Sequence, residues 1–357
     1  MQTVYNESIL ETIARIAPGT ELREGLERIL RGRTGALIVL GSDKTVQSIS
    51  SGGFNIDIEF TATRIRELAK MDGAIICDRE ATTLLNAGVQ LLPDPTIETQ
   101  ESGTRHRTAE RVAVQTGFPV ISVSSSMSLI SVYVDGIRYT VEDSQTIMSR
   151  ANQAIQTLES YTNRLEQVLS SLSALEIEAN VTVRDVAATL QRMEMVRRIS
   201  TEAGFYLVEL GSNGRLIALQ LEELNRPEMP SSDVILRDYL PEDANGNKSL
   251  RAAQKKLQQL DDKEIVDLAR IARTVGLDAT DLDSLLYPRG YRLLSGIKTM
   301  PGAVVDRLVE QFDGLQGLMA ANLKDLRAVD GIGGQRARII RESLSRMAES
   351  SLLEQFM

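Results

Sequence analysis

The sequence predicts an α/β N-terminal domain with a mixed sheet, then an all-α helical spine, and then a C-terminal pair of similar helical units. Three observations lead to this prediction. Short β-rich runs alternate with helical patterns over residues 1–143, an unbroken apolar seam opens residues 144–288, and a helical repeat occupies residues 289–357. We therefore divide the chain into three domains at these boundaries.

The bulk composition is that of an ordinary globular protein. The chain has 357 residues, of which 25% are charged and 42% hydrophobic, and its formal net charge is −9. This charge argues against a protein that coats nucleic acid over its whole surface. The single cysteine, Cys77, excludes an internal disulfide framework. Because no apolar run is long enough to span a membrane and no signal pattern is present, we expect a cytoplasmic protein without a membrane partner.

The mixed sheet of the first domain is predicted from five β-rich runs. The last two are joined by Asp135-Gly136, a strong hairpin turn that adds an antiparallel component. Helical patterns at 22–30 and 63–70 lie between the earlier runs. The predicted strands are 36–40, 73–77, 119–123, 130–134 and 137–141.

The spine is predicted from apolar residues that repeat at alternating spacings of four and three. The seam covers about four heptads, or roughly 40 Å of helix at about 1.5 Å per residue. It is either the contact line of a coiled coil or one face of a long helix within its own helical domain, and we favour the second interpretation. Its members are Ile147, Ala151, Ala154, Leu158, Tyr161, Leu165, Val168, Leu172 and Leu175.

The C-terminal domain repeats itself with an offset of 32 residues. A repeat of this kind indicates two similar helical units that pack as a pair. The aligned residues are Met300 with Ile332, Val305 with Ala337, and Leu308 with Ile340.

The second of these units contains the segment 329–338, whose hydrophobic–x–Gly–hydrophobic–Gly pattern is typical of a helix-hairpin-helix turn. Its glycines would let backbone amides approach a DNA phosphate, and its arginines add positive charge. We therefore expect contact with DNA that is independent of base sequence. A structural glycine turn between packed helices is the alternative. The candidate DNA-binding residues are Gly331, Gly333, Gly334, Arg336, Arg338 and Arg341.

The first unit departs from this pattern. It has Thr299 and Pro301 where the second unit has Gly331 and Gly333. A backbone that carries these side chains cannot approach a phosphate as closely. We expect the first unit to act mainly as a packing partner, and several copies in one oligomer could compensate for weak binding by one module.

The only histidine of the chain lies in the segment Gly103-Thr104-Arg105-His106-Arg107-Thr108. Guanidinium groups bind phosphate oxygens bidentately and hydroxyls add further donors, so the segment suits a polyphosphate. It leads into a helix-forming stretch at 109–114, which would place it at a helix N-terminus, where unpaired N–H groups favour anions. A solvated loop with helix-flanking charges is the alternative.

A second candidate element is Asp72-Gly73-Ala74, between a predicted helix and a predicted strand. A carboxylate beside glycine can bind a divalent cation while the bare backbone lets a ligand come close. Taken alone, Asp-Gly is first of all a turn. Beside a phosphate-binding segment, it could hold the metal that nucleotidyl transfer requires. Ser124-Ser125-Ser126, at the end of a strand, is a weaker candidate for phosphate contact.

Together, Asp72-Gly73-Ala74 and the 103–108 segment resemble the paired signature of the diadenylate cyclase domain family. The resemblance covers nearly the whole chain, because members of this family that scan DNA integrity have the same order of cyclase domain, helical spine and helix-hairpin-helix module. It implies condensation of two ATP molecules into cyclic di-AMP with release of two pyrophosphates. It also implies association with DNA, an octamer of two facing tetramers, and inhibition by branched DNA.

The resemblance also implies roles for individual residues. Asp72 would be the catalytic, metal-linked carboxylate near the attacking 3′-hydroxyl. Arg105 and Arg107 would neutralise the triphosphate, and His106 would donate a hydrogen bond to it. Leu91 would lie against the adenine, although an ordinary core leucine is the simpler interpretation without the family. The implied ATP-binding residues are Gly73, Ala74, Leu91, Gly103, Thr104, Arg105, His106, Arg107 and Thr108.

The implied reaction requires more than one copy of the chain. One protomer that holds one ATP cannot close the ring, so two copies must face each other across a two-fold axis. Mg²⁺ or Mn²⁺, bound through Asp72 and phosphate oxygens, would lower the pKa of the attacking hydroxyl and offset charge on the leaving pyrophosphate. The alternative from a different class is a non-enzymatic DNA-binding scaffold whose first domain only senses ATP.

Overall fold

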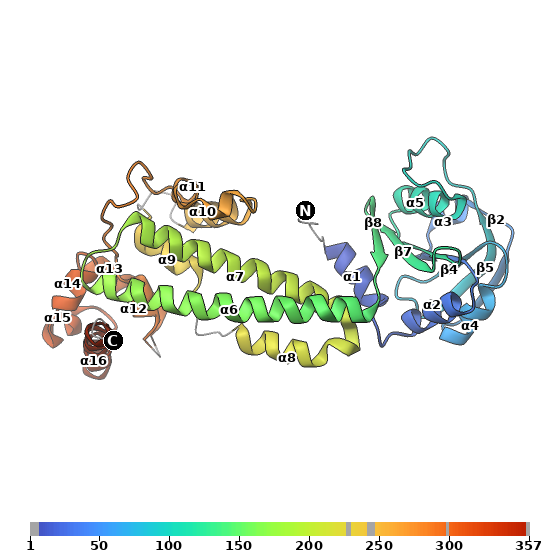
Figure 1. The fold of residues 1–357 in the computed structure, drawn as a ribbon. Coiled ribbons are helices and arrows are strands. Elements are labelled where there is room, and N and C mark those ends of the chain that lie inside the picture. The colour runs from blue at the N-terminus through green and yellow to red at the C-terminus, as the bar shows by residue number, and fades with distance from the viewer. Residues whose placement is uncertain (1–6, 226–229, 241–246, 298–299, 355–357) are drawn as a thin grey trace. The chain divides into compact units, whose positions relative to one another are not determined.

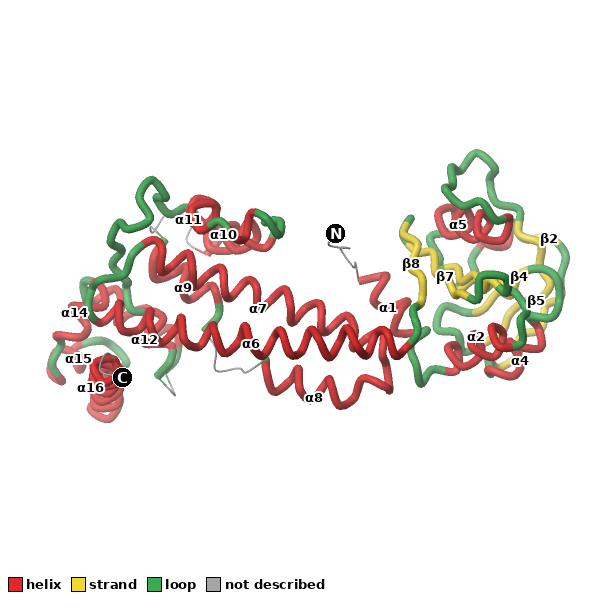
Figure 2. The backbone as a smooth tube through the Cα atoms, viewed as in Figure 1, coloured by secondary structure: helices red, strands yellow, loops and turns green. Residues whose placement is uncertain are grey.

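The computed structural model describes residues 7–225, 230–240, 247–297 and 300–354. The chain folds into two compact units, Met1–Ile155 with Glu202–Leu221 and Gln156–Thr201 with Glu222–Met357. Among the described residues, every named strand belongs to the first unit and the second unit is built from helices (Figure 2).

The sheet of the first unit consists of β1 (Ala36–Leu40), β2 (Ser50–Ser51), β3 (Phe54–Glu59), β4 (Ala74–Cys77), β5 (Thr83–Leu91), β6 (Val120–Ser124), β7 (Leu129–Val134) and β8 (Ile137–Val141). Their order is β2-β5-β4-β1-β6-β7-β8, and β3 also pairs with β5. β1 is parallel to β4, and the other pairs are antiparallel. The predicted mixed sheet and all five predicted strands are therefore confirmed, and β2, β3 and β5 are additional.

Helices cover both faces of this sheet (Figure 1). They are α1 (Glu7–Arg15), α2 (Glu21–Arg31), α3 (Lys44–Ser48), α4 (Ala62–Leu68) and α5 (Thr104–Thr116). Leu26 of α2 and Ile65 of α4 are fully buried in the cluster that covers one face. Ala109 and Val112 of α5 are fully buried in the cluster on the other face. Alternate residues of β1 point to the two clusters, which explains why its five residues are all buried.

The predicted seam lies on one continuous helix, α6 (Ser144–Ile177). Six of the nine seam residues are buried, and Tyr161, Val168 and Leu175 are half-buried. Leu165 and Leu172 belong to a core cluster formed with α7 (Val183–Leu210) and the helices that follow it. The structure thus supports a helix packed within its own helical domain over this part of the seam.

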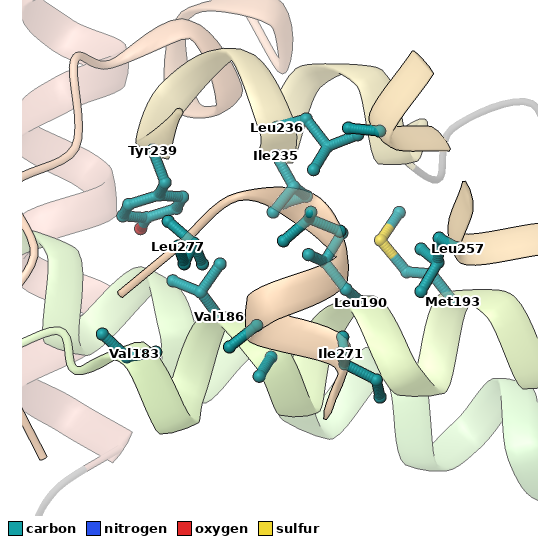
Figure 3. Packing of buried hydrophobic residues seen from close by; sticks show 14 of the residues in the cluster. Val183, Val186, Leu190, Met193, Ile235, Leu236, Tyr239, Leu257, Ile271 and Leu277 are labelled. Atoms are coloured by element: carbon teal, nitrogen blue, oxygen red, sulfur yellow. The ribbon is translucent and has the colours of Figure 1, made fainter. Parts of the chain in front are cut away.

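The helical region continues after α7. Its elements are the 3₁₀ turn η1 (Gly211–Gly214), α8 (Arg215–Leu224), α9 (Ser232–Tyr239), α10 (Asn247–Gln258), η2 (Glu264–Val266) and α11 (Leu268–Val275). Of these, α9, α10, η2 and α11 share a core cluster with α7. Figure 3 shows Val186 and Leu190 of α7 facing Ile235 of α9, with Ile271 of α11 in the same cluster. These four side chains are at most 1% exposed, so they form a dry core.

The C-terminal helices are α12 (Tyr291–Ser295), α13 (Gly302–Gln311), α14 (Gly314–Ala320), α15 (Leu323–Ala328) and α16 (Gly334–Glu354). The residues aligned by the predicted repeat all contribute to one core, in which Met300 is half-buried and the other five are buried. Thr299, which marks the departure of the first unit from the glycine pattern, lies outside the described residues.

Buried charge joins α12 to the preceding helices of the same unit. Arg292 donates from Nε to Oε1 of Glu176, 3.0 Å away. Asp238 accepts hydrogen bonds from the backbone N–H groups of Gly290, Tyr291 and Arg292 at 2.6–2.7 Å. Burial, followed by the nearby Glu176, raises the pKa of Asp238 to about 7. The start of α12 is therefore held by a carboxylate supplied by α9.

No helix in the described ranges is both long enough and apolar enough to cross a membrane.

Candidate functional site

Asp72 lies in the short turn between α4 and β4, and its side chain is exposed. The next residue, Gly73, has φ +106°, and a Cβ there would lie 2.6 Å from the carbonyl carbon of Gly88 on β5. Any larger residue would clash with backbone that cannot move aside, and its φ would be strained. Glycine is thus required at position 73 by the close approach of β5, and this contact holds the turn that presents Asp72.

Strand pairing brings Asp72 into line with a glycine and a serine on neighbouring strands. β1 pairs with β4 on one side and with β6 on the other. If both registers are continued by one residue before β1, Gly35, Asp72 and Ser124 lie in one row across the ends of these strands, which we call the sheet edge. The Arg105 guanidinium lies over Gly35, where its Nη1 is 2.0 Å from the position a Cβ would occupy. Asp72, Ser124 and the Arg105 guanidinium are therefore placed at the same end of these strands.

The segment that the sequence predicts to bind phosphate is part of α5 itself. The helix begins at Thr104, five residues before the helix-forming stretch at 109–114, and Gly103 is its N-cap. The cap supplies no side-chain acceptor, so the first N–H groups of the helix are uncapped. Thr104, Arg105 and Arg107 are exposed on its first turn. The predicted helix N-terminus is present, and the arginines project from the helix rather than from a preceding loop.

Thr108 differs from its neighbours in the segment. Its hydroxyl donates to the carbonyl of Thr104 at 3.0 Å, one turn back along the helix. The hydroxyl proton is thus already used within α5, and a contact with phosphate would have to break that bond.

The structure places His106 differently from the sequence prediction. Its side chain is only 5% exposed, and its Nδ1 lies 2.9 Å from the hydroxyl oxygen of Tyr133 on β7. Burial, with smaller contributions from Arg138 and Arg105 and against the effect of Glu101, lowers the pKa of the imidazole. The ring is thus buried and bonded to the sheet, because helix periodicity turns this position inward while 105 and 107 face solvent. The predicted hydrogen bond from His106 to the triphosphate stays a prediction.

Two further predicted contacts of the nucleotide are core residues. Leu91 is 8% exposed and Ala74 is 1% exposed, and both side chains belong to the cluster beneath α5. Leu91 therefore corresponds to the simpler interpretation, an ordinary core leucine, and Ala74 can reach a ligand only through its backbone. The exposed apolar side chain at this end of β5 is that of Leu92, at 57%.

The serine turn lies at the same edge as Asp72. Ser124 is buried at the end of β6, and its Oγ is 3.3 Å from that of Ser126. Ser125 and Ser126 are exposed. Of the three predicted serines, Ser125 and Ser126 are therefore the ones with side chains exposed to solvent.

The donors at the edge suit a metal that is shared with a ligand. In the part of the chain that the structure describes, no three His, Cys, Asp or Glu side chains gather into a metal site. Mg²⁺ is typically held by one or two carboxylates together with substrate phosphates. The lone exposed carboxylate of Asp72 therefore fits a cation that arrives with a nucleotide, and Mn²⁺ accepts the same ligands.

The glycine turn between α15 and α16 is also built as predicted. Gly331 has φ +82°, and Gly333 and Gly334 are exposed with open space where a Cβ would stand. Arg336 is half-buried and donates from Nη1 to the Gly331 carbonyl at 2.6 Å. Arg338 is exposed. The backbone here is accessible to a large anionic ligand.

Two arginines near this turn differ from the sequence prediction. Arg341 donates from Nη1 to the carbonyl of Met319 at 2.7 Å, so it closes the end of α14 instead of facing outward. Arg307 of α13 was not predicted, yet its Nη2 lies 2.7 Å from the position of a Cβ on Gly331. The first, glycine-poor unit thus supplies a cation to the turn of the second. No sequence signal marks Arg307, because only tertiary packing brings it there.

These features define a class of protein, in which a nucleotide-binding α/β domain precedes a helical linker. Residues 23–138 match a family model described as DisA bacterial checkpoint controller nucleotide-binding, and residues 141–282 match the DisA bacterial checkpoint controller linker region. The DNA integrity scanning protein DisA of Streptomyces coelicolor is 57% identical over 97% of this chain and 93% of that protein. The protein of the same name from Kineococcus radiotolerans is 56% identical over 98% of both chains. The chain belongs to the DisA family.

Among solved structures, DacA from Staphylococcus aureus overlaps 37% of this chain and 88% of that one, with 23% identity and a TM-score of 0.29. An overlap at this TM-score carries no argument about the site.

Proposed function

We propose that this protein is a diadenylate cyclase that condenses two ATP molecules into cyclic di-AMP and two pyrophosphates, and that DNA bound at its C-terminal helices regulates this activity. The observation that carries the proposal is the row at the sheet edge. It combines the exposed carboxylate of Asp72 with Arg105 and the uncapped start of α5. This combination suits a nucleotide triphosphate and its cation.

Each copy of the chain holds one nucleotide in this proposal. The uncapped N–H groups of α5 and the exposed guanidiniums of Arg105 and Arg107 bind the triphosphate oxygens. The exposed edge leaves the α-phosphorus and the ribose open to a second nucleotide. Two copies face each other, so that each presents its 3′-hydroxyl to the α-phosphorus of the other.

The same bond change occurs twice. The 3′-hydroxyl oxygen of one ATP bonds to the α-phosphorus of the other, the bond from that phosphorus to pyrophosphate breaks, and the hydroxyl proton is released. The second step is the same reaction with the roles of the two ATP molecules exchanged. The active assembly therefore has a two-fold axis, and an octamer of facing tetramers meets this requirement.

Asp72 would hold the divalent cation, Mg²⁺ or Mn²⁺, with phosphate oxygens of the nucleotide as further ligands. Such a cation makes the hydroxyl a better nucleophile and offsets the charge that develops on pyrophosphate.

The second half of the proposal concerns DNA. The open backbone at Gly333 and Gly334 and the exposed Arg338 form the contact with phosphates, joined by Arg307 from the first unit. Contacts of this kind are independent of base sequence, so selection of branched DNA must come from its shape and from several modules acting together. Arg341 and Arg336 act indirectly, because each already donates to a backbone carbonyl.

One product assay tests both halves. The full-length protein is incubated with ATP and Mg²⁺ or Mn²⁺, with and without a Holliday junction, and the nucleotides are separated and identified by mass. We expect cyclic di-AMP without DNA and less of it with the junction. In Asp72→Asn, product formation should fall by ~10³-fold, which corresponds to loss of several kcal/mol of metal-linked stabilisation.

Two controls make the assay decisive. Asp72→Asn should retain the oligomeric state by light scattering, and Asp43→Asn, which removes a carboxylate that caps α3 away from the row, should retain product formation. Wild-type protein that binds ATP and DNA but yields no cyclic di-AMP would establish the non-enzymatic scaffold instead.

A further inference from the structure

A chain of hydrogen bonds runs from the surface of the first unit to His106. Arg138 of β8 donates from Nη1 to Glu101 Oε1 at 2.8 Å, and the hydroxyl of Tyr133 donates to the same oxygen at 2.9 Å. The Tyr133 oxygen also lies 2.9 Å from Nδ1 of His106. Glu101 and His106 flank Gly103, the N-cap of α5. The chain thus ties both sides of the helix start to β7 and β8.

The direction of each proton along this chain follows from the chemistry of its members. A carboxylate can only accept a hydrogen bond, so the Tyr133 hydroxyl uses its single proton to donate to Glu101. The tyrosine oxygen can then interact with Nδ1 of His106 only as an acceptor, which requires the proton on Nδ1. Burial lowers the pKa of His106, so the ring carries one proton and not two. Its Nε2 is left with a lone pair.

The position of the ring indicates what that lone pair faces. Nδ1 points to the sheet, and Cδ2, on the opposite side of the ring, lies 3.5 Å from the position of a Cβ on Gly103. The Cδ2 side of the ring therefore lies next to the start of α5, and Nε2 is the ring nitrogen bonded to Cδ2. An unprotonated nitrogen there accepts a hydrogen bond and cannot donate one to a phosphate oxygen.

We infer that Tyr133 and Glu101 are positioning residues of the nucleotide site, which hold His106 in the Nδ1–H tautomer so that its Nε2 accepts a hydrogen bond from a hydroxyl of the bound nucleotide. This inference rests on the proposed function, because the ligand is the nucleotide of that site. It replaces the sequence-based role of His106 as a donor to the triphosphate. Phosphate binding falls to the arginines and the helix N–H groups, and the histidine acts as a hydrogen-bond acceptor toward the nucleotide.

The single histidine of the chain allows a direct test. Protein labelled with ring-¹⁵N histidine shows one imidazole in a solid-state NMR spectrum. We expect a protonated Nδ1 and an unprotonated Nε2 in the wild type, both free and with ATP. Tyr133→Phe removes the acceptor of the Nδ1 proton, so a mixture of tautomers should appear. Equilibrium binding of ATP to this variant should weaken by ~10-fold, as for loss of one hydrogen bond at a polar site.

Tyr139→Phe is the matched control. Tyr139 also donates its hydroxyl to a buried carboxylate, that of Glu209, in the same unit. The control loses a comparable bond without touching His106, so its tautomer and ATP affinity should equal those of the wild type. Glu101→Gln should behave like a milder Tyr133→Phe, because an amide can both accept from and donate to the tyrosine.

The outcomes separate this inference from the proposed function. A protonated Nε2 in the wild type, or a doubly protonated ring when ATP is bound, would overturn the positioning role even if cyclic di-AMP is made. An unchanged tautomer and ATP affinity in Tyr133→Phe would overturn it as well. If the tautomer and the affinities behave as expected and no product forms, the inference stands and the cyclase function fails.

Discussion

Two helices of this protein begin in the same way and are completed differently. Both α5 and α12 start at a glycine N-cap that offers no side-chain acceptor, Gly103 and Gly290. At α12 the N–H groups of residues 290–292 bond to Asp238, a buried carboxylate from another helix. At α5 no side chain caps the helix, and exposed arginines stand on the first turn.

The difference teaches how one physical property serves two purposes. The N-terminus of a helix favours an anion because its N–H groups are unpaired and its dipole is positive there. Where the protein must hold helices together, it supplies that anion from its own chain. At the start of α5, where we propose that ATP binds, no side chain caps the helix and arginines are exposed. Asp238 thus occupies at α12 the place that a phosphate would take at α5.

The largest effect is expected when the carboxylate of Asp238 is removed from the start of α12. Asp238→Ala would leave the three buried N–H groups of residues 290–292 without their acceptor, and we expect a loss of about 3–5 kcal/mol in the free energy of unfolding at pH 7. Urea denaturation monitored by circular dichroism measures this loss. Asp238→Asn retains an acceptor oxygen and should lose less than half as much. A change below ~1 kcal/mol in the alanine variant would show that the carboxylate contributes little to stability.

The pH dependence of the same site sharpens the comparison. The folded pKa of Asp238, about 7, lies above the unfolded value of 3.8, so the folded state binds the extra proton between these pH values. The contribution of Asp238 to the free energy of unfolding is therefore greatest below pH 4, and it declines as the pH rises to 7. Asp238→Asn should lack that decline. The free energy of unfolding of both proteins at pH 5 and pH 8 tests the sign.

A smaller effect is expected when a capping side chain is introduced at Gly103, the N-cap of α5. Gly103→Asp would give α5 its own carboxylate, as α12 has, in a backbone conformation that suits an N-cap and with space for the side chain. We expect the helix to gain up to ~1 kcal/mol in stability while ATP binds about tenfold more weakly. Calorimetry gives the first quantity and equilibrium dialysis the second.

Gly103→Ser separates charge from capping in this experiment. A serine caps the helix without negative charge, so ATP affinity should fall less than with aspartate. If the aspartate variant binds ATP as tightly as the wild type, the triphosphate does not bind at the start of α5.

The smallest effect concerns a third helix start, that of α16, which follows the exposed Gly333. Arg338→Glu should weaken DNA binding by about tenfold and reduce the salt slope by about one, since one phosphate contact is lost. Arg346→Glu is the matched control, because it is exposed on the same helix about 12 Å further along, at about 1.5 Å per residue. Fluorescence anisotropy over a salt series measures both. Equal slopes for all three proteins would place the DNA elsewhere.

Much of the fold could be predicted because its signals are local. The β-rich runs became β1, β4, β6, β7 and β8, and the apolar seam became the continuous helix α6. The segments of the candidate site were found for the same reason, since Asp72 beside Gly73 and the arginines around His106 are distinctive within a few residues. Local patterns identify the segments, and they do not show which way a side chain points.

What the sequence could not show within the site has that cause. His106 and Leu91 were identified as ligand contacts from their place in a motif, and the structure adds that the side chains of both are buried. Helix and strand periodicity turns them inward, and which face is inward depends on the layer that packs there. Arg307 was missed because it is 24 residues away from Gly331 in the chain, and only the packing of α13 on the second unit brings the two together.

The sequence by itself determined five of the eight named strands, the long helix α6, the turns that need glycine and the types of group available for phosphate, because these depend on neighbours along the chain. Only the tertiary structure decided that Gly35, Asp72 and Ser124 share one row, and that the histidine bonds to Tyr133 while the arginines remain exposed. Pairing of distant strands and burial beneath a helix depend on the whole domain, and a short segment carries no record of them.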